Sequence, residues 1–149
     1  MTTLVIRQAL VTDIDALASL FDEYRQFYGQ ASDVAAARTF LLARFQHRES
    51  VVFLAAAGAE ALGFMQLYPS FESIALRPML VLNDLYVRAS GRKQGIGTGL
   101  LGAAADYARA VGAASLQLST AVTNTTAQAL YEANGWVRDT AFYTYDLSV

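Results

Sequence analysis

The stretch that decides the fold is residues 81–101, VLNDLYVRASGRKQGIGTGLL. Together with Leu80, its first seven residues form a β-prone run that is mostly apolar, which predicts a strand buried on both faces. From Ile96 onward, apolar residues recur at helical spacing, which predicts an amphipathic helix. Between them lies a short basic loop, with glycines at positions 95, 97 and 99. The stretch therefore reads as strand, loop and helix.

The loop has the composition of an anion site. Glycine lets a ligand approach the backbone closely, and a helix N-terminus presents unpaired N–H groups with partial positive charge. Arg92 and Lys93 add full positive charge, which is unfavourable at this end of a helix unless an anion binds there. A phosphate or pyrophosphate fits best, and Thr98 adds a hydroxyl donor. The alternative is a glycine-rich turn that merely starts the helix.

Two common phosphate motifs fit this loop poorly. A Walker A loop requires a Lys after its glycines, and none follows here. A Gly-x-Gly-x-x-Gly pattern does occur at residues 97–102, but it lies far from the strand end at Val87. No acidic residue occupies the ribose-binding position about 20 residues further on. We therefore interpret Gly99 and Gly102 as helix residues that allow close packing.

The remaining pattern, Arg-x-x-Gly-x-Gly at residues 92–97, resembles the acetyl-CoA signature of the GCN5-related N-acetyltransferase (GNAT) superfamily. In that family the loop amides bind the pyrophosphate of the cofactor. The resemblance implies acetyl-CoA as co-substrate and contacts along the loop and the preceding strand. The cofactor-binding residues that it implies are Leu85, Tyr86, Val87, Arg92, Lys93, Gln94, Gly95, Ile96, Gly97 and Thr98.

Composition limits the classes that remain. The 149 residues predict one domain over 1–149, and the formal net charge is −2. The absence of cysteine excludes disulfides and thiolate metal sites, and a single histidine argues against a histidine metal site, so we expect no metal. No extended basic face, membrane-length apolar run or leader pattern occurs. We expect no nucleic-acid or membrane partner and a cytoplasmic location.

The whole chain predicts strands and helices in the order β-α-α-β-β-β-α-β-α-β-β. Strands are expected at residues 3–8, 51–57, 61–68, 80–87, 115–121, 136–137 and 141–147. Helices are expected at residues 14–28, from a Ser32–Asp33 cap to about 47, at 96–111 and at 124–133. Residues 69–78, bounded by both prolines, are expected to be a long loop. The element order resembles that of the GNAT fold throughout.

This resemblance implies an α/β (α+β) architecture. A mixed central sheet of six to seven strands is expected, flanked by four helices, with a splay between strands 4 and 5. In the family, the pantetheine arm of the cofactor lies in that split.

A second motif lies near the C-terminus. Asn124 and Tyr131 are seven residues apart, which is two helical turns, so they share a helix face. Singly, they are explained as an N-cap and a half-buried core residue. Together, with Gly135 and Trp136 behind them, they resemble the family's Asn-x6-Tyr segment. The resemblance implies that Asn124 contacts the cofactor and that Tyr131 is the general acid for the departing thiolate.

The general base has no clear match. Many family members carry a glutamate on the central strand, but the matching positions here hold Val81 and Asn83. Asp84 is the remaining candidate, although strand alternation places it opposite Val81 and Asn83, so a structural role is equally compatible. Candidate substrate-binding residues on the first helix and central strand are Glu23, Tyr24, Tyr28 and Asn83.

The leading hypothesis is an acetyl-CoA-dependent N-acetyltransferase, an EC 2.3.1-type acyltransferase, nearest to the polyamine/histone-type branch. The acceptor is expected to be a primary amine of a small molecule or peptide, which attacks the thioester directly. One alternative is a catalytically weak acyl-CoA-binding or sensing module of the same fold. Another is a dehydrogenase built on residues 97–102. A homodimer is a family-level expectation, encouraged by the aromatic residues at 142–145.

Overall fold

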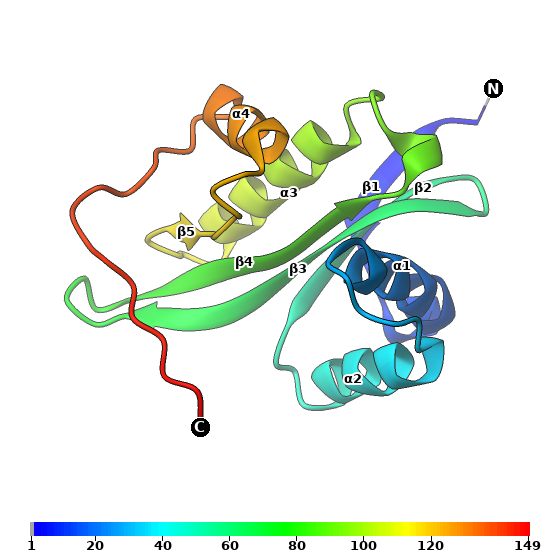
Figure 1. Ribbon diagram of the computed structural model, residues 1–149, viewed down its shortest axis with the longest axis horizontal. Coiled ribbons are helices and arrows are strands. Elements are labelled where there is room, and N and C mark those ends of the chain that lie inside the picture. Colours follow the sequence, from blue (N-terminus) through cyan, green and yellow to red (C-terminus); the bar gives the residue numbers. More distant parts are fainter. Residues whose placement is uncertain (1) are drawn as a thin grey trace. The chain divides into compact units, whose positions relative to one another are not determined.

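The computed structural model describes residues 2–149 (Figure 1). The chain divides into two compact units, Met1–Ser119 and Thr120–Val149. Within residues 2–149, no helix is both long enough and apolar enough to cross a membrane.

A five-stranded sheet forms the centre of the first unit, with strand order β1-β2-β3-β4-β5. Its strands are β1 (Leu4–Gln8), β2 (Val51–Ala57), β3 (Glu60–Glu72), β4 (Arg77–Val87) and β5 (Leu116–Gln117). The first four strands pair antiparallel, and β4 pairs with β5 in parallel. The sheet is therefore mixed, as predicted, and the fold is α+β.

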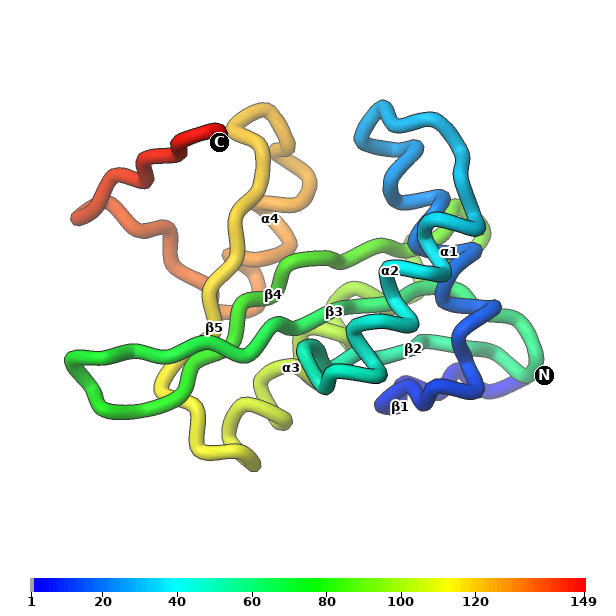
Figure 2. The backbone as a smooth tube through the Cα atoms, turned by 90° about the horizontal axis from the view of Figure 1, so that it is seen from below, coloured from blue at the N-terminus to red at the C-terminus, as the bar shows by residue number. Residues whose placement is uncertain are grey.

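Helices cover both faces of this sheet. The helices of the first unit are α1 (Ile14–Phe27), α2 (Val34–Gln46) and α3 (Ile96–Ala110). Figures 1 and 2 show α1 and α2 over one face and α3 over the other. The predicted cap of α2 is confirmed, because the Asp33 side chain accepts a hydrogen bond from the Ala36 N–H at 3.0 Å.

The core under α1 and α2 is apolar and closely packed. Phe21 of α1 meets Phe64 of β3 edge to face, with ring centroids 5.9 Å apart. The buried residues of this cluster are Ala9, Ile14, Leu17, Leu20, Phe21, Ala37, Leu41, Val52, Leu54 and Phe64.

The long loop predicted at residues 69–78 is wrong. Both strands continue through it as one long hairpin, in which Pro69 pairs with Leu80 and Phe71 with Pro78. The partner strand β2 ends its pairing at Leu67, so Pro69 lies where β3 has a free edge and its missing N–H costs no ladder bond. The prolines therefore mark the free edge of a strand, and the turn itself is short.

The predicted strand count is also wrong, because the described chain has five strands and not six or seven. The strand expected at 115–121 is reduced to Leu116–Gln117. In the second unit, α4 (Thr125–Ala133) is confirmed, but residues 136–137 and 141–147 form no strand. A β-prone segment becomes a strand only when a neighbour supplies hydrogen bonds, and these residues pair with no strand in the described chain.

Candidate functional site

The start of α3 presents a row of unpaired backbone donors. Within residues 2–149, no acceptor bonds the backbone amides of residues 93–98, and the N-cap Gly95 offers no side chain. Residues 92–95 are exposed. Gly95 has φ +77°, in the left-handed region that glycine favours, and this turn leads the loop into the helix. Open amides at the positive end of a helix can bind a phosphate group.

Two side chains of the loop fix its shape. Arg92 Nε donates to the carbonyl oxygen of Val87 at 3.1 Å, and Gln94 Nε2 donates to that of Ser90 at 3.0 Å. The Lys93 side chain forms no ion pair with any described residue. Gln94 can therefore meet a ligand through its backbone, whereas the Lys93 ammonium group can reach an anion directly.

One edge of β4 is paired with another strand over only a short length. Its parallel pairing with β5 is limited to Leu80 with Leu116 and Val81 with Gln117. The Val87 carbonyl accepts from Arg92, so it points away from β3. In a strand, the N–H and C=O of one residue point the same way and alternate residues point oppositely. Leu85 and Val87 therefore turn their N–H groups to this edge.

Tyr86 differs from these two neighbours. Its carbonyl oxygen would lie 2.9 Å from a Cβ atom added to Gly63, so the Tyr86 backbone faces β3. Its ring contacts that of Tyr24 at a centroid distance of 6.2 Å. Of the three strand residues expected at the cofactor, only Leu85 and Val87 present backbone donors to the open edge.

A β-bulge decides the direction of Asp84. Leu82 pairs with Leu67 and Asp84 pairs with Gln66, so Asn83 is an extra residue in β4. The bulge reverses the alternation, and the expectation that Asp84 lies opposite Val81 is wrong. Asp84 shares a face with Gln66 and with Phe64, which packs on α1. The carboxylate therefore faces the side of the sheet that α1 and α2 cover.

Asp84 belongs to a buried polar cluster. Its side chain accepts from Gln66 Nε2 at 2.8 Å and from Asn83 Nδ2 at 3.2 Å. Asp84 is 5% exposed and Gln66 is fully buried. Burial, with a further contribution from the Asp84 charge, raises the pKa of Tyr68 to about 12. Sequence reasoning missed Gln66 and Tyr68, and its one available signal was a glutamine inside an apolar strand.

The helix residues expected at the acceptor divide into two groups. Tyr24 lies beside the bulge, with its hydroxyl 3.5 Å from the Asn83 carbonyl oxygen, and its ring contacts exposed Tyr28 at 5.1 Å. The Glu23 carboxylate instead forms an ion pair with Arg88, directly after β4. The structure thus brings Tyr24, Asn83 and Asp84 together, whereas Glu23 is already neutralised.

The Glu23–Arg88 pair ties α1 to the end of β4. Arg88 Nη1 also donates to the Ala61 carbonyl at 2.9 Å, and the Tyr86 hydroxyl lies 3.4 Å from Glu23 Oε1. Burial, and then the charge of Glu23, raise the pKa of Tyr86. This ion pair holds together the helix beside the bulge and the strand that leads into the amide loop.

The second unit holds the other predicted pair. Asn124 is the N-cap of α4, and its Oδ1 accepts from the Ala127 N–H at 3.2 Å. Tyr131 lies two turns further along, with its ring 6.2 Å from that of Trp136. The backbone N–H of Trp136 donates to the Tyr131 carbonyl oxygen at 3.0 Å, and this hydrogen bond closes the helix end. The two residues share a helix face, as their spacing predicts.

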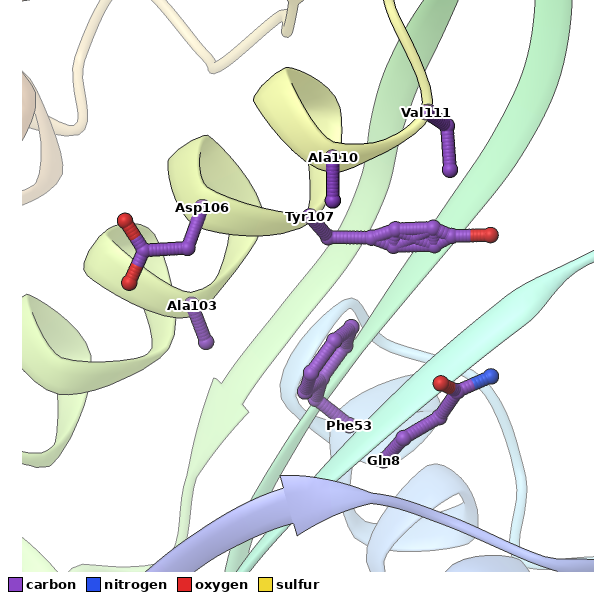
Figure 3. Close-up of a pocket in the computed structure, with 7 residues that line it drawn as sticks. All are labelled: Gln8, Phe53, Ala103, Asp106, Tyr107, Ala110 and Val111. Atoms are coloured by element: carbon purple, nitrogen blue, oxygen red, sulfur yellow. The ribbon is translucent and has the colours of Figure 1, made fainter.

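A groove of about 560 Å³ lies beside the C-terminal half of α3 (Figure 3). Tyr107 and Phe53 form its aromatic wall, with ring centroids 6.0 Å apart. Its lining residues are Gln8, Phe53, Ala103, Asp106, Tyr107, Ala110 and Val111. The lining contains no cation, so it does not suit a diphosphate, and no predicted site residue contributes to it.

Comparisons with known proteins agree on one family. Residues 15–136 match the model of the acetyltransferase (GNAT) family. The uncharacterized N-acetyltransferase YhfO of Bacillus subtilis is 47% identical over 144 residues, covering 97% of each chain. A probable acetyltransferase of Haemophilus influenzae is 34% identical over 96 residues, covering 64% of this chain and 66% of that one. A crystal structure of a probable acetyltransferase covers 97% of both chains at 42% identity, with a TM-score of 0.92.

Proposed function

This chain belongs to the GNAT family of N-acetyltransferases, and on that premise we propose that it transfers an acetyl group from acetyl-CoA to a primary amine. The family implies an acyl-CoA donor. The observation that carries the proposal for the donor site is the row of unpaired amides at residues 93–98, beside Lys93. These groups suit the diphosphate of coenzyme A.

The open edge of β4 supplies the next part of the proposed donor site. Attack on a thioester produces a tetrahedral oxyanion, which needs donors already in place. The N–H groups of Leu85 and Val87 point to this edge, and we assign them to the thioester and the adjoining pantetheine arm. The short β4–β5 pairing supports the splay that this arm requires.

The proposed chemistry is direct acyl transfer. The neutral amine attacks the carbonyl carbon, the new C–N bond forms, and the C–S bond breaks. Tyr131 protonates the departing thiolate, an assignment supported by its place on α4. Asp84 takes a proton from the incoming ammonium, supported by the bulge that turns it toward α1.

The acceptor is proposed to bind on the side of the sheet that α1 and α2 cover. Tyr24 lies beside Asn83, the neighbour of Asp84, and its ring contacts Tyr28, which supports a role for these residues at the acceptor, an amine of a small molecule or peptide. The segment 83–87, Asn-Asp-Leu-Tyr-Val, supports a place near the polyamine/histone-type branch.

Exposed aromatic residues of the C-terminal segment, Phe142, Tyr143 and Tyr145, support a homodimer, which light scattering would detect.

Release of CoA thiol with a panel of amines tests the proposed reaction. Replacing Lys93 with alanine tests the donor site: affinity for acetyl-CoA should fall about fivefold or more, because a direct phosphate contact is lost. Arg109→Ala is the matched control, since Arg109 is an exposed cation at the far end of α3 from the loop. Equal affinities of the two variants would refute the diphosphate assignment.

A catalytically weak acyl-CoA-binding module is the second candidate. The observation that favours it is the absence of a glutamate at positions 81 and 83 of β4. Such a module would bind acetyl-CoA as tightly as an enzyme but release no CoA thiol above the rate of hydrolysis with any amine in the panel.

A further inference from the structure

The fully buried Gln66 has a fixed orientation. Its Nε2 donates to Asp84 Oδ2 at 2.8 Å, and the flipped amide would set two oxygen atoms against each other. Gln66 Oε1 is consequently the atom that has no hydrogen-bond partner among residues 2–149. The Tyr68 hydroxyl interacts with the same Gln66 side chain but does not meet hydrogen-bond geometry at Oε1, and a buried acceptor without a well-aligned donor is costly.

The Asp84 carboxylate also has no counter-ion in the described chain. Its donors are two neutral amides, from Gln66 and Asn83. Arg44, whose charge acts on the neighbouring Tyr68, forms an ion pair with Glu49 at 3.2 Å. A buried charge is stabilised best by an opposite charge with good hydrogen-bond geometry. The cluster is therefore suited to receive a cation.

The two carboxylate oxygens of Asp84 have different hydrogen-bond partners. Buried Gln66 holds Oδ2, whereas Oδ1 is held by Asn83 Nδ2 at a longer distance of 3.2 Å. Asn83 is exposed and is the extra residue of the bulge, so strand packing does not fix its side chain. An ammonium group forms a stronger hydrogen bond to a carboxylate than a neutral amide does, and it can displace Asn83.

Resting on the acetyltransferase function above, we propose that Asp84 Oδ1 binds the acceptor's protonated amine in place of Asn83 Nδ2, with Gln66 as positioning residue. The Tyr24 ring, which lies beside Asn83, can cover the alkyl part of the acceptor and contribute a cation–π contact. The substrate class is a primary alkylammonium ion.

The step that follows balances in atoms and charge. One ammonium proton passes to Asp84 and then to water, and the neutral amine forms the C–N bond. As the C–S bond breaks, its electron pair leaves with sulfur. Tyr131 donates its proton to that sulfur and takes the second proton of the former ammonium in return, and the third proton stays on the product amide.

Binding of ethylammonium chloride to the unliganded protein tests this site without requiring turnover. The readouts are the Asp84 carboxylate carbon and the Gln66 side-chain amide signals in NMR spectra. We expect saturable shifts with ethylammonium but not with tetramethylammonium, which lacks N–H donors. Gln66→Leu should weaken binding about tenfold or more, since it releases the carboxylate. Gln8→Leu, the same change at an exposed residue of β1, should leave binding unaltered.

Asn83→Ala tests whether the amine displaces the Asn83 side chain or is bound by it directly. Removing the competing amide should tighten ethylammonium binding severalfold, whereas a ligand role for Asn83 would weaken it and overturn the proposal. The Asn83→Ala titration remains a test of the proposal even if Gln66→Leu does not fold. Absence of a saturable shift at about 100 mM ethylammonium would also overturn it.

Kinetics provide the second readout. In Gln66→Leu the KM for the amine should rise about tenfold while the KM for acetyl-CoA stays unchanged. If the wild-type protein binds ethylammonium but releases no CoA thiol with any amine, the proposed function fails and the cation site stands. If turnover occurs and Gln66→Leu leaves the amine KM unchanged, the positioning role fails and the function stands.

Discussion

The carboxylate of Asp13 joins the first strand to the first helix through three hydrogen bonds. Both of its oxygens accept from Arg7 at 2.8 Å, and Oδ2 also accepts from the Leu10 N–H at 2.8 Å. The hydrogen bonds from Arg7 are the main cause that lowers the pKa of Asp13 from 3.8 to about 2.

Because the folded pKa lies below the unfolded value, this stabilisation is complete above about pH 4 and is lost as the pH falls toward 2. Asp13→Asn should therefore flatten the loss of unfolding free energy between pH 4 and pH 2, measured by urea denaturation. Asp106→Asn, in an exposed pair with Arg109, is the control. Parallel curves for wild type and Asp13→Asn would contradict the assignment.

The Tyr131 hydroxyl carries the proposed proton donation, and its removal leaves the ring that contacts Trp136. Tyr131→Phe should lower kcat about 100-fold, the usual scale of general acid catalysis, without changing acetyl-CoA affinity. Steady-state kinetics and calorimetry separate these two effects. Tyr107→Phe, at the groove beside α3, should leave both unchanged. A wild-type kcat for Tyr131→Phe would remove the acid role.

Close packing between elements requires some glycines of this chain and not others. A Cβ atom on Gly63 of β3 would lie 2.9 Å from the Tyr86 carbonyl oxygen and 3.3 Å from Ile96, whereas one on Gly102 of α3 would meet no atom within 4 Å. Gly102 therefore does not serve the close packing expected of it. Gly99 does serve it, because its added Cβ would contact the Ile6 side chain.

This contrast makes a paired prediction about stability. Gly63→Ala should lower the unfolding free energy by about 1–3 kcal/mol, because the backbone of β4 would have to move. Gly102→Ala should raise it by about 0.5–1 kcal/mol, because alanine favours the helix at no steric cost. Thermal and urea denaturation of both variants measure this difference. Equal stabilities would show that β3 and β4 can separate freely at this point.

Elements with a local signal were predicted well. The strand at residues 51–57 and the helix begun by Asp33 are confirmed, because a short apolar run and a capping residue are local signals that span only a few residues. The hairpin of β3 and β4 was misread, since Pro69 is compatible with a strand only at a free edge. Where β2 ends is not visible from β3 itself.

At the scale of the whole molecule, the cofactor should stabilise the fold. A ligand at a hundredfold excess over its Kd adds about 2.7 kcal/mol, which for a chain of this size raises Tm by roughly 5–10 °C. We expect this shift with acetyl-CoA and none with NAD, measured by scanning fluorimetry. Stabilisation by NAD instead would favour the dinucleotide reading of residues 97–102.

Some parts of the candidate site could be predicted from the sequence and others could not. The loop at residues 92–98 was found from sequence, because a basic, glycine-rich helix start is a contiguous pattern. Gln66 and Asp84 are 18 residues apart, and Glu23 and Arg88 are 65 apart, so no window of sequence contains either pair.

The sequence by itself determined where most helices and strands lie, the α3 start and the family resemblance, since each depends on spacing along the chain. Tertiary structure decided that the sheet has five strands, that the bulge at Asn83 turns Asp84 toward α1, and that Gln66 is left with an unmet oxygen. Register between strands is set by contacts across the sheet, and one extra residue reverses every side chain beyond it.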